Sequence, residues 1–557
     1  HHESIHTVYS NRCAAYTHLK QYELALSDAN KCIQLRPDWY KGYIRKGNVY
    51  AEQDDLDEAE IVYLEGLKKV DKNDTVGKKL LNKCKNDIDT ARLNKLGPEQ
   101  KIVGGKHIQA DKFRRLIKWL LDGGAKFPKL YLKFYTPEYR AIHAMDAIQK
   151  DEDICYIPHD YIMTSDVAKA SEIGKQLINS NIELRSKHSY LASYLLVERE
   201  KGENSRWHIY IDILPRKFNT IPLFFNDIQR SELRGSIALR KIDDRLESLK
   251  LEYESICEHI DGFERFSLED FTWARLVVIT RIFGLVINDI KTDGLVPMAD
   301  MLNHKRPRET KWTYAQKKHG FLITSLQTIK KEAEIFDSYG RKCNSRFFVN
   351  YGFSLEYNAD NEARMVFELP RNDAQFTIKA KYLGFNIHGN NFRKEFQIPR
   401  QYKEKKVKEC FSFLRVLHAQ GNEFLIISSH DGIRLDDIPP LSIRNETNVL
   451  TSLAVAATKA LKLFDTTLDY DNDLLKDEVK YPRFSNDRNA VLMRRGEKEV
   501  LTFYIDLMKI CIPLFKTKDA KDCMNKINAE KRLRSNDSLF TQYVTHVVIP
   551  LIQRQMR

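Results

Sequence analysis

The chain has 557 residues, of which 42% are hydrophobic and 30% charged, and its formal net charge is +13. This length exceeds what one hydrophobic core organises and predicts about three or four domains. No apolar run approaches the ~20 residues that span a bilayer, and no signal peptide opens the chain. We therefore expect no membrane contact and a cytoplasmic protein, with the nucleus as the alternative.

The charges and the cysteines narrow the function classes further. Lysine and arginine are interspersed with aspartate and glutamate, which favours a solvated surface of mixed charge over a nucleic-acid interface. The nine cysteines lie apart from one another, and no CxxC pair occurs. We therefore expect reduced thiols, no zinc cluster and no metal cofactor.

Residues 1–97 carry an internal repeat with a period of 34 residues. This period is typical of tetratricopeptide (TPR) repeats, in which each unit is a pair of antiparallel helices. About three units are needed to bury a continuous core, and two are visible, so we expect a further repeat before residue 1 and a capping helix at residues 75–96. Four positions hold the register: Tyr9 recurs as Tyr43, Cys13 as Gly47, Tyr16 as Tyr50 and Ala25 as Ala59.

The same repeats suggest a peptide-binding groove. Their sequence is similar to the chaperone-binding class of TPR repeats, and the resemblance implies that Asn11, Lys41 and Arg45 clamp the C-terminal carboxylate of a chaperone peptide. Lys41 and Arg45 lie one helical turn apart, so they share a face on which two cations suit a carboxylate. The alternative is that both are ordinary charges on a helix surface.

The predicted secondary structure changes twice along the middle of the chain. The pattern of residues 98–167 predicts one amphipathic helix followed by short strands, the last at residues 156–158. Residues 168–293 are predicted to be helical and to end in an apolar helix at 271–283. Short β-like runs follow at residues 376–396, and helices dominate from there to the end.

The stretch 294–353 holds two polar segments, DMLNH at residues 300–304 and SYGRKCN at residues 338–344. An apolar run precedes each of them, at residues 295–298 and 334–336. Each run predicts a short buried strand, so both polar segments are expected to lie at the ends of strands.

Polar groups at the end of a buried strand need partners, so Asn303 and His304 are either satisfied core residues or ligand contacts. Together with the Tyr-Gly pair that begins at Tyr339, they resemble the signature of SET-domain methyltransferases. The likeness is to the branch of the Rubisco lysine methyltransferases and the actin-histidine methyltransferase, and it covers about residues 110–515. In that family the two segments pass through one another in a pseudoknot, although chains rarely thread.

The resemblance implies a multidomain fold. After the all-α TPR repeats at residues 1–97, residues 98–167 and 294–373 would form the two parts of an α+β SET domain with short, pseudoknotted β-sheets. Residues 168–293 would be its helical insert, and residues 374–557 an all-α domain that helps to bind the protein substrate.

The resemblance also implies S-adenosyl-L-methionine as the cofactor. Asn303, His304 and Glu152 would hold it. Phe353 would pack on the adenine, and Tyr339 would lie at the point of methyl transfer. For Glu152 the alternative is a plain surface glutamate, and for the aromatic residues it is a core position, since tyrosine and phenylalanine at strand ends are more often core than site.

These roles predict a chemistry. A lysine amine has a pKa of ~10.4 and must lose its proton before it attacks a methyl group. A narrow desolvated channel favours the neutral amine, and Tyr314 and Tyr351 are the candidates for its lining. We therefore expect a protein-lysine N-methyltransferase that acts on a protein other than a histone, since the cysteine-rich zinc flanks of histone-directed relatives are absent.

Two alternatives stay open. One is a histidine-directed enzyme, which needs a wider and more polar channel than lysine does. The other is a catalytically silent SET scaffold that serves as an interaction surface. Residues 140–144 (RAIHA) stand where relatives carry a glycine-rich turn that lets the backbone approach the cofactor, and residues 331–334 (KEAE) stand where relatives carry Gly-Glu-Glu. Both departures favour the scaffold.

Overall fold

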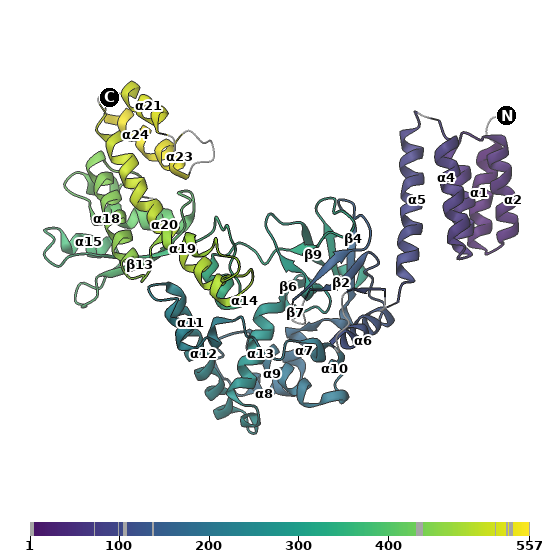
Figure 1. Ribbon diagram of the computed structural model, residues 1–557, viewed down its shortest axis with the longest axis horizontal. Coiled ribbons are helices and arrows are strands. Elements are labelled where there is room, and N and C mark those ends of the chain that lie inside the picture. Colours follow the sequence, from purple (N-terminus) through teal and green to yellow (C-terminus); the bar gives the residue numbers. More distant parts are fainter. Residues whose placement is uncertain are drawn as a thin grey trace. The chain divides into compact units, whose positions relative to one another are not determined.

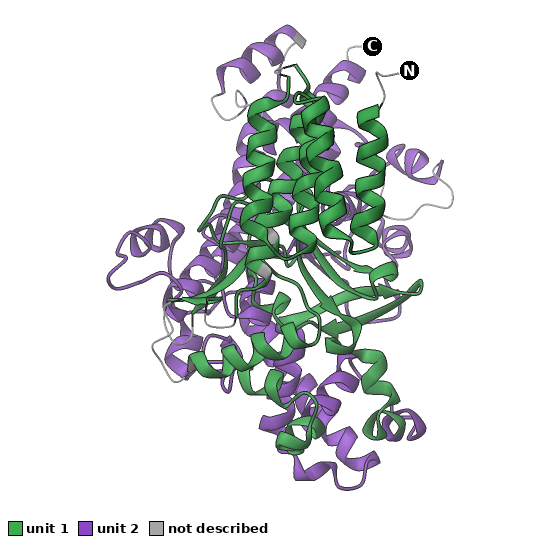
Figure 2. Cartoon of the chain, turned by 90° about the vertical axis from the view of Figure 1, so that its right-hand side faces the viewer, with its two compact units in different colours: residues 1–175, 197–214, 281–339 green, residues 176–196, 215–280, 340–557 purple. Residues whose placement is uncertain are grey.

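The computed structural model describes residues 5–71, 73–97, 100–103, 109–135, 139–429, 438–517, 520–530, 533 and 539–555. The chain divides into two compact units, shown in different colours in Figure 2. Unit 1 comprises residues 1–175, 197–214 and 281–339, and unit 2 comprises residues 176–196, 215–280 and 340–557.

Unit 1 begins with five helices that lie side by side (Figure 1). Short turns join them into antiparallel pairs, so the 34-residue repeat of the sequence corresponds to a repeated helix–turn–helix. At Gly47 an added Cβ would lie 2.2 Å from the Tyr63 ring, so this close helix contact requires glycine. The predicted capping helix is present. The five helices are α1 (Ile5–His18), α2 (Tyr22–Leu35), α3 (Tyr40–Glu52), α4 (Leu56–Lys69) and α5 (Thr75–Asn94).

Helix α6 (Gln109–Asp122) leads into the first sheet, in which β1 (Ile102–Val103), β2 (Leu130–Phe134) and β3 (Arg140–Ala144) lie in that order. Residues 140–144, which stand where relatives of the resembled family carry a glycine-rich turn, form β3 and pair antiparallel with β2. The residues of this segment after Arg140 are buried, and side chains with a Cβ suit a packed strand better than a turn.

Two further sheets of unit 1 consist of antiparallel pairs only. The strands β6 and β7 contradict the prediction that residues 168–293 are helical throughout, since the last helix of that region, α13 (Leu268–Arg281), ends before them. Asn288 and Asp289 both have positive φ, at 49° and 63°, and so make a tight hairpin turn between the two strands. In one sheet the strand order is β4 (Asp153–Pro158), β10 (Gly320–Ser325) and β9 (Thr310–Ala315). In the other it is β5 (Met163–Thr164), β7 (Ile290–Leu295) and β6 (Ile282–Ile287).

The end of the first polar segment forms a short parallel pair of strands with the residues just before the second. Strand β8 (Asn303–His304) pairs with β11 (Phe336–Asp337), with Asn303 opposite Phe336 and His304 opposite Asp337. The predicted strand at residues 295–298 is wrong, because β7 ends at Leu295. Pro297 has no N–H for a ladder, and Met298 has a left-handed φ of 71°. The predicted strand at 334–336 begins instead at Phe336.

Short and long helices fill the region between β5 and β6. Residues of unit 2 pack together here: the indole N–H of Trp273 donates to the carbonyl oxygen of Pro215 at 2.7 Å. The helices before α13 are α7 (Ser165–Ala170), α8 (Glu172–Asn179), α9 (His188–Glu200), α10 (His208–Ile213), α11 (Asp227–Ser231) and α12 (Ile237–His259).

The C-terminal part of unit 2 is mostly helical but not all-α, which corrects the prediction for residues 374–557. Strand β13 (Arg393–Ile398) pairs antiparallel with β12 (Ala363–Glu368), whose alternate residues are buried in the unit's main core. Conversely, α15 (Phe376–Tyr382) is a helix where β-like runs were expected. The remaining helices are α14 (Asn344–Tyr351), α16 (Lys405–Leu417), α17 (Glu423–Ser428), α18 (Ile443–Leu461), α19 (Leu468–Leu474), α20 (Asn486–Phe515), α21 (Ala520–Ala529), α23 (Leu539–Tyr543) and α24 (Ile549–Gln555).

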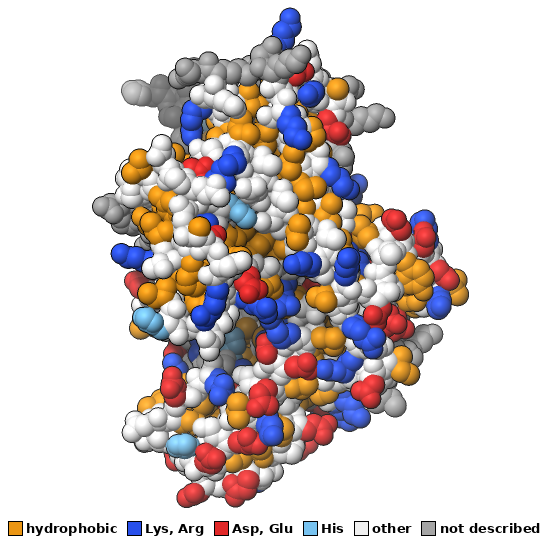
Figure 3. Space-filling view, turned by 90° about the vertical axis from the view of Figure 1, so that its left-hand side faces the viewer, with side chains coloured by type: hydrophobic (Ala, Val, Ile, Leu, Met, Phe, Trp, Pro, Cys, Tyr) orange, Lys and Arg blue, Asp and Glu red, His pale blue; other side chains and the backbone are white. Residues whose placement is uncertain are grey.

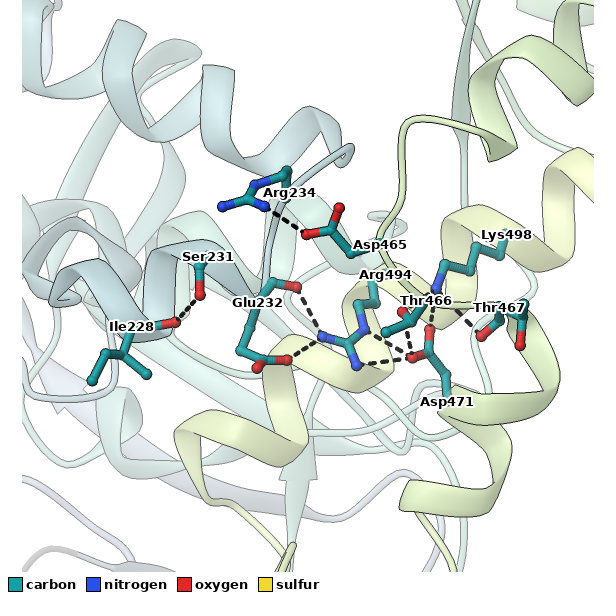
Figure 4. Close-up of polar contacts among 10 residues, drawn as sticks. All are labelled: Ile228, Ser231, Glu232, Arg234, Asp465, Thr466, Thr467, Asp471, Arg494 and Lys498. Carbon is teal, nitrogen blue, oxygen red and sulfur yellow. Dashed lines mark hydrogen bonds and ion pairs between the residues drawn. The ribbon is translucent and has the colours of Figure 1, made fainter.

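A buried ionic network joins helices of unit 2 (Figure 4). The fully buried Asp471 carboxylate accepts hydrogen bonds from Arg494 Nε at 2.9 Å and from Lys498 Nζ at 2.6 Å. Arg494 also donates to the carbonyl oxygen of Glu232 at 2.9 Å and pairs with its carboxylate. Buried charges persist only when they are paired, so this network ties α19 and α20 to the segment after α11.

The surface carries charges of both signs. On the face drawn in Figure 3, lysine and arginine side chains lie among aspartate and glutamate side chains and between hydrophobic patches. Within the described ranges, none of the helices combines the length and the apolar character that a membrane span requires.

Candidate active site

The site forms where β8 and β11 end. His304 Nδ1 accepts a hydrogen bond from the backbone N–H of Tyr339 at 2.9 Å, and the two rings lie 5.1 Å apart. The Tyr339 hydroxyl donates to the carbonyl oxygen of Leu302 at 2.8 Å. The structure thus brings Asn303, His304 and Tyr339 together, as the two sequence segments predict.

The amide of Asn303 connects this pair of strands to β3. Its Nδ2 donates to the Glu334 carboxylate at 2.8 Å and to the backbone carbonyl of Arg140 at 3.3 Å. Both the amide and the carboxylate are partly exposed, so the polar groups of the site are reachable from outside the core.

A buried ionic cluster lies next to the same segment. The fully buried Asp300 carboxylate accepts hydrogen bonds from the Tyr210 hydroxyl at 2.8 Å and from Arg281 at 3.0 Å. Burial, followed by the Asp300 charge, raises the pKa of Tyr210 well above its ordinary value. Burial, followed by the charge of Arg281, lowers the pKa of Arg140 to about 10. Helix α10, the end of α13 and β3 supply these groups.

Three buried polar atoms of this cluster have no hydrogen-bond partner among the described residues: Asp300 Oδ1, Arg140 Nε and Arg281 Nε. Buried polar groups are normally satisfied, so such atoms indicate a place for water or a ligand. The site therefore offers acceptors on Asn303 and Glu334 and cations on the two arginines. A zwitterionic amino-acid group, such as the one in S-adenosylmethionine, needs both kinds of partner.

Glu152 has contacts of its own. Its carboxylate pairs with the buried Lys129 ammonium at 2.8 Å and accepts from the backbone N–H of Gln149 at 2.9 Å. Lys129 also donates to the carbonyl oxygen of Ala147 at 3.0 Å. The described contacts of Glu152 thus hold the segment before β4, and a cofactor role for it stays a prediction.

Tyr314 lies in a separate aromatic cluster of unit 1. Its hydroxyl is within hydrogen-bonding distance of His159 Nδ1, at 3.1 Å, and of His319 Nδ1, at 3.2 Å. The ring is buried, and the two imidazoles stack with their centroids 5.3 Å apart. None of the described contacts joins Tyr314 to Tyr339, so its place in a substrate channel stays a prediction.

Phe353 and Tyr351 belong to unit 2. Phe353 stacks on Phe347 at 5.1 Å between ring centroids, and the Lys342 ammonium lies 5.8 Å from the centroid of the Tyr351 ring. Their predicted roles against the adenine and in the channel remain predictions.

The predicted carboxylate clamp is divided between two helices. Asn11 on α1 and Lys41 on α3 are exposed, whereas Arg45 donates from Nε to the Ser10 hydroxyl at 3.3 Å. A cavity of about 450 Å³ opens among α1, α3 and α5, and Arg45 and Tyr63 are among its lining residues, but Asn11 and Lys41 are not. A clamp formed by these three residues stays a prediction.

Sequence reasoning missed Tyr210, Arg281, Asp300 and Glu334. Three of them carried a signal. Glu334 ends residues 331–334 (KEAE), which stand where relatives of the resembled family carry Gly-Glu-Glu. Asp300 opens the polar segment DMLNH, and Arg281 is a charge near the end of an apolar helix, where burial requires a partner. Tyr210 carried none, because its partner Asp300 lies 90 residues away.

Two family models match the chain. Residues 140–340 match the SET domain, and residues 370–501 match the Rubisco LSMT substrate-binding domain. The residues that meet at the ends of β8 and β11 lie in the first of these regions, and the N-terminal helices α1 to α5 lie outside both.

The chain is also similar to known methyltransferases. It is 26% identical over 408 residues to the actin-histidine N-methyltransferase of Gallus gallus, covering 70% of this chain and 67% of that protein. It is 29% identical over 296 residues to the ribosomal lysine N-methyltransferase set10 of Schizosaccharomyces pombe, covering 52% and 53%. A crystal structure of the SET domain of LSMT bound to lysine and AdoHcy matches with a TM-score of 0.58 and 22% identity, covering 73% of this chain and 93% of that one. A structure of Rubisco LSMT bound to AdoMet matches similarly, at 0.57 and 22%, covering 72% and 92%.

Proposed function

We propose that this chain is an S-adenosylmethionine-dependent methyltransferase that modifies a side-chain nitrogen of a protein. Its matches to the SET domain and to the Rubisco LSMT substrate-binding domain support this. The observation that carries the proposal is the meeting of Asn303, His304 and Tyr339 at the ends of β8 and β11. The acceptors and buried cations around them fit the amino-acid part of the cofactor.

Different residues of the chain would bind the cofactor and orient the acceptor side chain. When bound, S-adenosylmethionine supplies a methyl group activated by a sulfonium. Asn303 and His304 hold the cofactor, and Tyr339 places its hydroxyl beside the acceptor nitrogen. That hydroxyl donates its proton to the carbonyl oxygen of Leu302, so toward an incoming side chain its oxygen acts as the acceptor of the N–H and orients it.

The acceptor is proposed to be histidine or lysine, in that order. The actin-histidine relatives align over 70% of this chain, and the ribosomal lysine relative over 52%, so the longer alignment favours histidine. Lysine remains the second candidate because the relative with the higher identity methylates lysine according to its name. The two acceptors differ in shape and in pKa, so the product distinguishes them directly.

The experiment is methylation of cell-extract proteins with labelled S-adenosylmethionine, followed by hydrolysis and amino-acid analysis. Labelled methylhistidine or methyllysine would support the proposal and name the acceptor. If the wild-type protein binds S-adenosylmethionine in calorimetry but labels no protein, the catalytic assignment is wrong. If it does not bind the cofactor at all, the chain is a silent scaffold.

The two flanking regions would recruit proteins. We propose that α1 to α5 are TPR repeats, on the strength of the 34-residue register and the helix–turn–helix pairs. The matched substrate-binding region at residues 370–501 would contact the protein substrate. A pocket that admits one side chain cannot by itself distinguish between proteins, so such surfaces must supply the selectivity.

A further inference from the structure

The amide of Asn303 has two chemically different ends, and its surroundings distinguish them. The nitrogen carries two N–H donors, and two acceptors face it: Glu334 Oε1 at 2.8 Å and the carbonyl oxygen of Arg140 at 3.3 Å. A flipped amide would instead place its oxygen against a carboxylate and a carbonyl, which repel it. Nδ2 therefore stays on this side, and Oδ1 points to the other.

Among the described residues, no hydrogen bond ends on Asn303 Oδ1, so this oxygen is available as an acceptor. A fixed amide oxygen suits an ammonium group, because the acceptor is already oriented before the ligand arrives. The α-ammonium of S-adenosylmethionine is such a group, and it occurs equally in S-adenosylhomocysteine.

The backbone of Glu334 and its neighbours is hydrogen-bonded to the segment of β3. On either side of it, Ile335 N donates to the carbonyl oxygen of Ile142 at 2.8 Å, and Ala144 N donates to that of Ala333 at 3.0 Å. The Glu334 backbone forms a bridge with His143 of β3. The side chain of Glu334 therefore starts from a fixed point, and its contact with Asn303 does not depend on a mobile loop.

The two tyrosines that flank the β2–β3 connection lie near the Glu334 carboxylate. Burial, followed by the Glu334 charge, raises the pKa of Tyr139 to about 12, and the same two causes raise that of Tyr135. The two rings stack with their centroids 5.1 Å apart.

We propose that Glu334 is a positioning residue: it orients the Asn303 amide so that Oδ1 receives the α-ammonium of the cofactor, and it thereby sets the affinity for S-adenosylmethionine. This inference rests on the proposed function. It assigns no contact between Glu334 and the reacting atoms.

An experiment can distinguish this positioning role of Glu334 from a direct electrostatic one. Its negative charge could act directly on the sulfonium of S-adenosylmethionine, which S-adenosylhomocysteine lacks. Orientation of the amide predicts equal losses for both ligands, whereas attraction of the sulfonium predicts a loss for S-adenosylmethionine alone.

The test is calorimetry of both ligands with the full chain and three variants. Glu334→Ala removes the acceptor and should weaken both ligands by about tenfold. Glu334→Gln keeps an acceptor oxygen for Nδ2 and should bind both within about threefold of wild type. Glu332→Gln is the matched control, since Glu332 is exposed and its side chain has no described contact with Asn303; it should bind as wild type does.

A double-mutant cycle tests whether Glu334 acts through Asn303. If it does, Glu334→Ala should have no further effect in an Asn303→Ala background. Additive losses would overturn the inference, as would wild-type affinity in Glu334→Ala, or a loss in Glu334→Gln confined to S-adenosylmethionine. Should Glu334→Ala fail to fold, Glu334→Asp takes its place: its shorter side chain withdraws the acceptor from Asn303 Nδ2 and should weaken both ligands equally, and wild-type affinity for both would overturn the inference. A wild-type chain that binds neither ligand would overturn the proposed function itself.

Discussion

The hydroxyl of Tyr339 donates a hydrogen bond to the backbone carbonyl of Leu302, 2.8 Å away, and the backbone N–H of the same tyrosine donates to His304 Nδ1 at 2.9 Å. One segment, residues 302–304, thus holds Tyr339 both at its hydroxyl and at its backbone N–H. The carbonyl of Leu302 thus fixes the direction of the hydroxyl proton. This relationship makes the role of Tyr339 testable.

Tyr339→Phe keeps the ring beside His304 and removes only the oxygen. We expect turnover to fall by about 10²-fold or more, the effect of losing one positioned polar group, while cofactor affinity and stability stay nearly unchanged. Single-turnover rates and calorimetry measure the two quantities. Tyr253→Phe is the control, since its hydroxyl also donates to a carbonyl, at 2.7 Å, but lies in unit 2. Equal rates for Tyr339→Phe and wild type would exclude a catalytic role.

His304→Ala should act differently. It removes the acceptor of the Tyr339 N–H and the ring that lies against the tyrosine. We expect about 1–3 kcal/mol less stability, because a partly buried donor loses its partner, together with weaker cofactor binding. Denaturant unfolding and calorimetry on the same sample measure both. A variant that loses turnover alone would mean that His304 acts in chemistry and not in holding the segment.

Asp471→Ala should be severely destabilising. It leaves the buried Lys498 cation without its carboxylate and leaves Arg494 only the half-exposed carboxylate of Glu232, at a cost of about 3–5 kcal/mol. The control is Asp473→Ala, whose carboxylate is 70% exposed and pairs with an exposed lysine, Lys476, so that its loss should cost under about 1 kcal/mol. Equilibrium unfolding in urea compares the two. Similar losses would show that burial does not decide the strength of the network.

Glu497→Gln tests a pH dependence. Burial raises the pKa of Glu497 to about 7, above its ordinary value of 4.5, against the opposing effects of the Ser236 hydroxyl, the Lys241 charge, the Ile237 N–H and the Lys498 charge. The folded state therefore binds the proton more tightly than the unfolded state. This contribution to stability is fully present below pH 4.5 and is lost as the pH rises through 7.

Since glutamine is neutral at every pH, the variant should gain stability relative to wild type between these two values, by on the order of 3 kcal/mol. Thermal unfolding of both proteins from pH 5 to pH 8.5 measures the difference. A difference that does not change with pH would show that the carboxyl group titrates normally.

The next prediction concerns the peptide that helices α1 to α5 would bind. If Lys41 and Arg45 clamp a terminal carboxylate, a peptide with a free C-terminus should bind the full chain more tightly than its amidated form, by about 1.5–3 kcal/mol. Lys41→Ala and Arg45→Ala should each reduce that difference, and Lys46→Ala, one residue along the same helix, should leave it unchanged. Fluorescence anisotropy measures all four proteins. Equal affinity for the two peptides would exclude the clamp.

Local sequence patterns were enough to predict the N-terminal helix pairs and the location of the site. The 34-residue register predicted the helix pairs of α1 to α4, and the capping helix α5 followed from one apolar stripe. The Asn-His and Tyr-Gly segments indicated where the site lies, because polar groups next to short buried strands need partners. Such inferences succeed where a residue's neighbours along the chain are also its neighbours in space.

Other features depended on contacts that no local pattern contains. Strands β6 and β7 pair with each other where the pattern predicted helix, and α15 is a helix where β-like runs were expected. The donors of Asn303 are satisfied by Arg140, 163 residues away, and by Glu334, 31 residues away. A hydrogen bond depends on distance and direction in space, and only folding brings such groups within 3.5 Å. The residues that orient the site were therefore decided by the tertiary structure.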